Sequence, residues 1–211
     1  MTLSDKILAA NGALLDEMLD HRFVQDIAND RLPRVVFHRY LAFEGAFVET
    51  AVSIFAFATA RAPDMASQRW LIAVLDALAN RQVTYFEEIN QRRAIDPPAK
   101  TPAAVIAFDQ GMLHLAQEGR FVDIVTAMFA AEWMYWTWCS RVARRQTSDP
   151  DLRAWIDLHA EPEFEQQARW LKSAIDQHAA PDDLKRLTEV FAHVTQLEID
   201  FHHAAYEEDT P

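Results

Sequence analysis

The chain has 211 residues, of which 50% are hydrophobic, and a formal net charge of -12 from 32 acidic against 20 basic side chains. This length suits one domain with a substantial core, so we expect residues 1–211 to form a single domain. A negative surface repels phosphate backbones, which argues against a nucleic acid partner. With 4 glycines and no GxGxxG or GxxxxGK pattern, the sequence excludes those phosphate loops and disfavours a fold of many tight turns.

The chain's single cysteine and its N-terminal stretch indicate where the protein resides. Cys139 has no partner for an intramolecular disulfide, which fits a reducing cytoplasm. The opening MTLSDKILAANGALLDEML lacks the basic segment and apolar run of a secretory signal. The strongest apolar stretch, at 51–60, is shorter than the roughly 18 to 20 residues that span a bilayer. We therefore predict a cytoplasmic protein with no membrane partner.

Helical periodicity dominates, and proline-containing stretches such as IDPPAKTP at 95–102 separate segments of helix length. The segment 34–60 is apolar nearly all round and should be a central helix. The other predicted helices are 65–93, 102–118, 121–145, 150–160, 162–179 and 182–207. The starts in SDPDLRAWI and APDDLKRL carry a capping acid or Ser and an early Pro. No strand pattern persists, so we predict an all-α bundle of about seven to nine helices.

Three acidic residues lie inside otherwise apolar helical segments, namely Glu44, Glu132 and Glu198. An aromatic residue follows each of them three positions later, and residues at i and i+3 share a helix face. These aromatic residues are Phe47, Tyr135 and Phe201. If the three faces converge, they form an aromatic-walled pocket with several carboxylates, which suits a flat, basic heteroaromatic ligand.

These acids also have an interpretation that needs no ligand. A single Glu in a mostly apolar helix usually lies at the edge of the buried face, with its carboxylate in water. An aromatic residue at i+3 is more often part of the core than a platform for a ligand. Spacing alone leaves both interpretations open.

The histidines raise the question of a metal site. His202 follows Glu198 by four residues, and together with Glu44, Glu132 and His159 the pair would resemble a di-iron set. However, the two Glu-x-x-His motifs of di-iron bundles are absent. We therefore expect neither a metal nor another cofactor, and we assign His159, His202 and His203 surface or capping roles by default.

Three stretches, taken in order and spacing, resemble one known family over nearly the whole chain. They are HRFVQDIANDRLPRVVFHRYL at 21–41, LRAWIDLHAEPEFEQQARWL at 152–171 and LEIDFHHAAY at 197–206. The family is TenA, which contains thiaminase II and aminopyrimidine aminohydrolases. The resemblance implies a heme-oxygenase-like all-α fold and a homodimer or homotetramer.

The resemblance also implies roles for individual residues. Glu44 falls where the family usually has an Asp that holds the amino edge of the pyrimidine, and it is one methylene longer. Phe47 and Phe108 match aromatic wall positions. Glu198 matches the C-terminal catalytic acid, and Phe201 the ring beside it.

The stretch around Tyr135 departs from the better-known branch of the family. Tyr135 matches a Tyr that neighbours the nucleophile, and the Cys expected four residues earlier is Ala131 here. The chain instead resembles a second branch, in which a Glu one residue later, Glu132, replaces that Cys. Cys139 lies two turns beyond the expected position and should not be catalytic. His159 occupies a position usually held by Tyr.

These matches predict a hydrolase of thiamin salvage, with Glu132, Glu198 and Glu44 as catalytic residues. Its substrate would be a small aminopyrimidine, 4-amino-5-aminomethyl-2-methylpyrimidine or an N-acyl derivative. The predicted substrate-binding residues are Phe47, Phe108, Tyr135, His159 and Phe201. One alternative is a pyrimidine-binding or regulatory protein that performs no chemistry, and a weaker one is a di-iron oxidase of the same fold.

Overall fold

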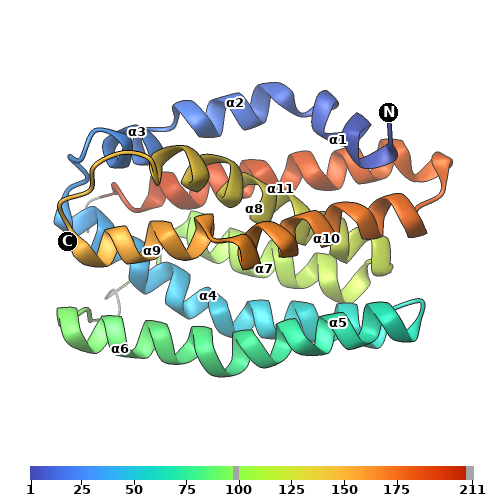
Figure 1. The fold of residues 1–211 in the computed structure, drawn as a ribbon, viewed down its shortest axis with the longest axis horizontal. Helices are drawn as coiled ribbons and strands as arrows, with labels where there is room; N and C mark the ends of the chain where they lie inside the picture. The colour runs from blue at the N-terminus through green and yellow to red at the C-terminus, as the bar shows by residue number, and fades with distance from the viewer. Residues whose placement is uncertain (97–99, 208–211) are drawn as a thin grey trace. The chain divides into compact units, whose positions relative to one another are not determined.

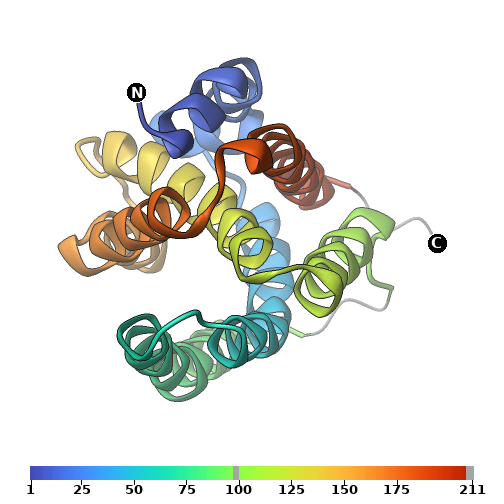
Figure 2. The ribbon, with the colours of Figure 1, turned by 90° about the vertical axis from the view of Figure 1, so that its right-hand side faces the viewer.

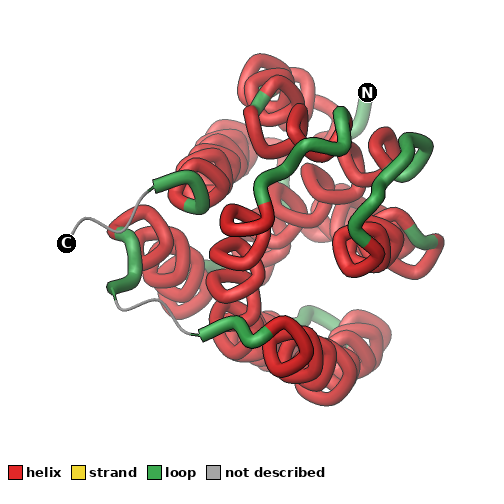
Figure 3. Tube along the Cα trace, turned by 90° about the vertical axis from the view of Figure 1, so that its left-hand side faces the viewer, coloured by secondary structure: helices red, strands yellow, loops and turns green. Residues whose placement is uncertain are grey.

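The computed structural model describes residues 1–96 and 100–207 of the chain. Within these residues every regular element is helical, as Figure 3 shows, which confirms the predicted all-α class. The chain divides into two compact units, one of residues 1–33 and 125–199 and the other of residues 34–124 and 200–211. A single domain over 1–211 stays a prediction, and part of the link predicted at 95–102 lies outside the described residues.

The second unit is built around the predicted central helix, α4. Its helices are α4 (Arg34–Ala60), α5 (Met65–Asp76), the π-helical η1 (Ala77–Gln82), α6 (Val83–Arg93) and α7 (Ala103–Glu118). Helix α4 packs against α5, α6 and α7, and its buried residues include Phe37, Tyr40, Ile54 and Phe55. The apolar composition of this segment is therefore explained by neighbours on several sides.

The segment predicted as one helix at 65–93 contains a π-helical turn. In Figure 1, α5, η1 and α6 follow one another in a single line alongside α4. A Cβ added to Gly45 of α4 would lie 3.2 Å from the Phe86 ring of α6. The missing side chain at Gly45 therefore allows the close approach of α6 to α4.

Among the described residues, one helix is long and apolar enough to cross a membrane, and it is α4. In its most apolar window, 44% of the residues are buried inside the protein. Because a core helix has the same length and composition, α4 is weak evidence for a membrane span.

The first unit contains three short N-terminal helices that the periodicity did not predict, followed later in the chain by four longer ones. They are α1 (Leu3–Ala10), α2 (Gly12–Asp20), α3 (Arg22–Ala28), most of α8 (Phe121–Val142), α9 (Pro150–Ala160), α10 (Pro162–His178) and most of α11 (Leu184–Ala204). Figure 2 shows α10 (orange) beside α8 (yellow). The predicted start at Pro150 is confirmed, with Asp149 capping the backbone N–H groups of Asp151 and Leu152.

Two predicted helices differ from the structure by more than one residue at an end. Helix α8 ends at Val142, before the predicted 145, and α11 begins at Leu184, after a 3-10 turn at Pro181–Asp183. The core of the first unit contains Trp138 and Trp155, which are fully buried with ring centroids 5.6 Å apart. This contact between large rings holds α8 against α9 and thereby sets the face that α8 presents.

Candidate functional site

Glu132 is a buried acid on α8, and its two carboxyl oxygens have different surroundings. The residue is 6% exposed. Gln167, on α10, donates a hydrogen bond from its Nε2 to Oε1 of Glu132 at 2.7 Å. Oε2 is fully buried, and no hydrogen-bond partner for it lies among the described residues. One oxygen is therefore held by a hydrogen bond from Gln167, and the other is buried without one.

Burial raises the pKa of Glu132 from 4.5 to about 8, and the hydrogen bond from Gln167 opposes this only in part. The cause is that a poorly hydrated site disfavours the charged carboxylate. Glu132 is consequently protonated for the most part at pH 7. A group with a pKa close to the working pH is suited to giving and taking a proton during catalysis.

Tyr135 links the helix of Glu132 to a second predicted acid. It lies three residues after Glu132 on α8 and so shares its helix face. Its hydroxyl donates to Oε2 of Glu198, on α11, at 3.4 Å. Glu198 is 1% exposed. The Tyr135 hydroxyl therefore links α8 to the carboxyl group of Glu198 on α11.

His159 is a neutral aromatic residue at this site rather than a surface or capping residue. It is buried against Tyr135 and Trp155, with ring centroids 5.3 Å and 4.3 Å away. Its Nδ1 lies 2.9 Å from the carbonyl oxygen of Trp155 and must donate, since a carbonyl only accepts. Burial lowers the pKa of His159 to about 4.

The default role assigned to the histidines was therefore wrong for His159. It was also wrong for His202, which is fully buried beside Tyr40 at a ring distance of 5.2 Å. His203, the next residue, is exposed. The reason is that adjacent residues on a helix point about 100° apart, so one faces the core and the other does not.

The remaining predicted residues lie in the second unit. Phe108 packs between Phe47 and Phe201, with ring centroids 4.5 Å and 4.9 Å away, so the three predicted wall residues form one aromatic cluster. Glu44 is 8% exposed, so all three predicted acids are buried residues. That Glu44, Glu132 and Glu198 converge on one pocket stays a prediction.

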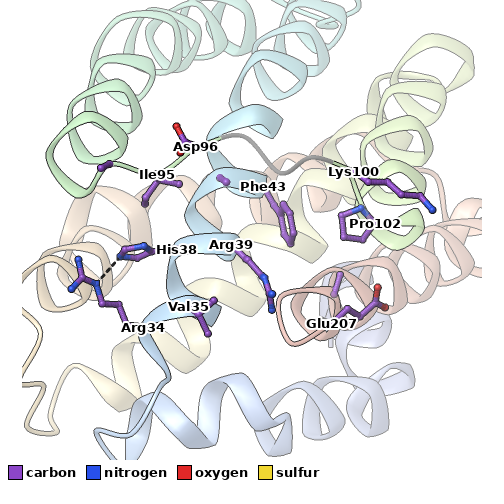
Figure 4. A pocket seen from close by; sticks show the side chains of 13 residues that line it. Arg34, Val35, His38, Arg39, Phe43, Ile95, Asp96, Lys100, Pro102 and Glu207 are labelled. Carbon is purple, nitrogen blue, oxygen red and sulfur yellow. Dashed lines mark hydrogen bonds between the residues drawn. The ribbon is translucent and has the colours of Figure 1, made fainter. Parts of the chain in front are cut away.

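A cavity of about 550 Å³ lies elsewhere in the second unit, and none of the predicted site residues is among the residues that line it. Figure 4 shows Arg34 and His38 at one end of this cavity and Lys100 and Glu207 at the other. Its cationic side chains thus do not converge on one point.

Gln167 is the site residue that the sequence analysis missed. It lies next to Gln166 in a polar stretch of α10, and nothing in the spacing separates the two. The two differ only in the folded protein, where α10 packs beside α8. Gln166 is then exposed and Gln167 is partly buried.

We expect Cys139→Ser to leave catalytic turnover within a few fold of the parent. The Cys139 side chain is 0% exposed, inside the core of the first unit, and lies seven residues from Glu132 along α8. Steady-state kinetics of the two proteins, each checked for folding by circular dichroism, would test this. A hundredfold loss in a folded variant would show that the thiol takes part in the reaction.

Comparisons with known proteins identify relatives that match nearly the whole chain. The sequence model of the TENA/THI-4/PQQC family matches residues 11–208. An aminopyrimidine aminohydrolase from Halalkalibacterium halodurans is 25% identical over 202 residues, which cover 90% of this chain and 88% of that protein.

Solved structures show the same fold. A TenA homologue from Pyrococcus furiosus superposes with a TM-score of 0.88 at 20% identity, covering 97% of this chain and 100% of its own. A TenA family transcription regulator from Silicibacter sp. TM1040 gives a TM-score of 0.86 at 17% identity, covering 95% of both chains. The predicted heme-oxygenase-like class is thereby confirmed.

Proposed function

Because the chain belongs to the TENA/THI-4/PQQC family, we propose that it hydrolyses a thiamin-related aminopyrimidine in thiamin salvage. The substrate is 4-amino-5-aminomethyl-2-methylpyrimidine or its N-acyl derivative, and the chain represents the branch with Glu in place of Cys. The observation that carries this proposal is Glu132, a buried acid with a pKa of about 8 directly after Ala131. The named activity of the Halalkalibacterium halodurans relative supports it. We further propose a cytoplasmic homodimer or homotetramer.

The reaction breaks the bond between the exocyclic methylene carbon and the amine nitrogen. Protonated Glu132 gives its proton to the departing nitrogen, which leaves with the electron pair of the bond. Water adds to the carbon and returns a proton to the Glu132 carboxylate. The products are a hydroxymethylpyrimidine and the free amine, or the amide from an N-acyl substrate.

Other residues bind and orient the pyrimidine in this proposal. Glu198 hydrogen-bonds a ring nitrogen, which makes the methylene carbon easier to attack, and Tyr135 orients Glu198 through its hydroxyl. His159, neutral at pH 7, adds an uncharged ring to this end of the site. The stacking roles of Phe47, Phe108 and Phe201 and the ring-orienting role of Glu44 follow from the family resemblance.

A pyrimidine-binding or regulatory protein is the second candidate, and the Silicibacter sp. TM1040 structure bears a regulator's name. The state of Glu132 favours an enzyme over a binding protein. Keeping an acid buried with a raised pKa costs folding free energy, and groups with shifted pKa values cluster at functional sites. No group of three metal-ligating side chains occurs among the described residues, so nothing in the structure favours the oxidase alternative.

The proposed function is tested by incubating the purified protein with the aminomethylpyrimidine, its N-formyl derivative and thiamin separately. We expect the hydroxymethylpyrimidine, detected by chromatography, to form from at least one of the first two compounds. Thiamin should be cleaved more slowly, because thiolate, the stronger nucleophile, is missing. Calorimetric binding of both pyrimidines without any product would favour the binding-protein alternative.

A further inference from the structure

The amide of Gln167 contacts one oxygen of Glu132 and leaves the other alone. Its Nε2 lies 2.7 Å from Oε1, whereas Oε2 is buried without a partner among the described residues. This asymmetry goes beyond the proposed acid role of Glu132, because it specifies which oxygen carries the proton.

We propose that Gln167 is a positioning residue, which keeps the proton of Glu132 on Oε2 and presents that O–H to the reacting nitrogen. An amide N–H can only donate, so the oxygen that faces it must accept. In a protonated carboxyl group the carbonyl oxygen is the better acceptor. Oε1 is therefore the carbonyl oxygen, and the proton stays on Oε2.

A neutral donor is well suited to this task. An Arg or Lys at position 167 would place a positive charge beside Glu132, which lowers a carboxyl pKa by several units and keeps the group ionised. An aliphatic residue would leave Oε1 without a partner in a buried site. Gln167 orients the carboxyl group, while burial still holds the pKa of Glu132 at about 8.

This inference rests on the proposed function, and it assigns the proton at each step. The Oε2–H bond breaks as the proton moves to the departing nitrogen, while Oε1 keeps its hydrogen bond to Gln167. The proton of the attacking water then returns to Oε2. Since Oε1 never exchanges a proton, the carboxyl group need not rotate between turnovers.

The test compares Gln167→Met with the parent and with Gln166→Met as the matched control. Gln166 is the exposed neighbour on the same helix, so the control makes the same chemical change where it should not matter. The pKa of Glu132 is measured by NMR on protein with ¹³C-labelled glutamate carboxyls, with the signal identified by its loss in Glu132→Gln.

We expect Gln167→Met to raise the pKa of Glu132 by about one to two pH units, because a hydrogen bond that favours the charged form is lost. Gln166→Met should leave it unchanged. A lower pKa in Gln167→Met would mean that Gln167 accepts the proton, which places it on Oε1 and overturns the proposal. An unchanged pKa would overturn it as well.

Turnover adds a second readout that a merely structural role would not move. The alkaline limb of the kcat profile should shift upward with the pKa, and kcat at pH 7 should fall by about tenfold with KM nearly unchanged, since orientation is lost rather than binding. A rise in KM at constant kcat would make Gln167 a substrate-binding residue instead. If the parent shows no turnover at all, the proposed function fails, whereas the NMR titration still tests the placement of the proton.

Gln167→Glu extends the test to a variant of the same shape, should Gln167→Met not fold. Two neighbouring carboxyl groups then hold one proton between them, so one apparent pKa should fall below about 8 and the other should rise above it. A single unchanged titration of Glu132 in this variant would contradict direct contact between the two side chains.

Discussion

Glu132→Gln should lower aminopyrimidine turnover by a factor of about 10² to 10⁴, with binding of the pyrimidine retained. The Gln side chain has the shape of the protonated Glu, and its carbonyl oxygen can accept the hydrogen bond from Gln167. It cannot release a proton to the departing nitrogen. Single-turnover kinetics would measure the loss, and calorimetric titration would measure binding.

Glu88→Gln is the matched control for this change, because Glu88 is exposed on α6 and its charge faces water. We expect it to keep the parent rate. If Glu132→Gln also keeps the parent rate, the carboxyl group of Glu132 is not needed. Another acid, with Glu198 the first to examine, would then have to supply the proton, or the protein would be a binding protein.

Glu132→Gln should be more stable than the parent at alkaline pH and similar to it near pH 5. Folding raises the pKa of Glu132 from 4.5 to about 8. Between these values the folded protein binds more protons than the unfolded chain, so the parent loses stability as pH rises. Each pH unit between the two pKa values lowers the unfolding free energy of the parent by at most about 1.4 kcal/mol. The upper limit over the whole range from 4.5 to about 8 is therefore about 5 kcal/mol.

Urea unfolding of parent and Glu132→Gln at pH 5, 7 and 9 would measure this difference in unfolding free energy. His159 adds an opposite limb: folding lowers its pKa from 6.5 to about 4, so stability falls as pH drops through that range. This limb occurs in both proteins and cancels in the difference. A difference that stays constant from pH 5 to 9 would mean that Glu132 titrates normally in the folded protein.

Long helices were predictable because they leave a periodic trace in the sequence. The segments 34–60 and 150–160 were placed correctly, since apolar spacing and the Asp149–Pro150 cap are local signals. The helices α1, α2 and α3 have 8, 9 and 7 residues, too short for the period to stand out. The aromatic residue at i+3 correctly indicated that Glu132 and Tyr135 share a face.

What the sequence could not supply is the identity of the residue opposite that face. Periodicity gives a direction around one helix axis and says nothing about the neighbouring helix. Gln167 was therefore not predicted. The burial of His159 was not predicted either, although the family resemblance placed His159 among the substrate-binding residues. Both depend on how α9 and α10 pack against α8, which is a tertiary property.

The π-helical segment Ala77–Gln82 fixes the rotation of α6 about its axis relative to α5. An α-helix turns by about 100° per residue, so deleting one residue there would rotate all of α6 by that angle about its axis. Phe86 and Ile89, now buried, would leave the side of α4, and polar residues would take their places. Natural insertions and deletions are usually absorbed in loops, but this segment must keep its length although it contains none of the predicted catalytic residues. A change in its length would therefore appear as a rotation of α6 about its axis and not as a break in the chain of helices.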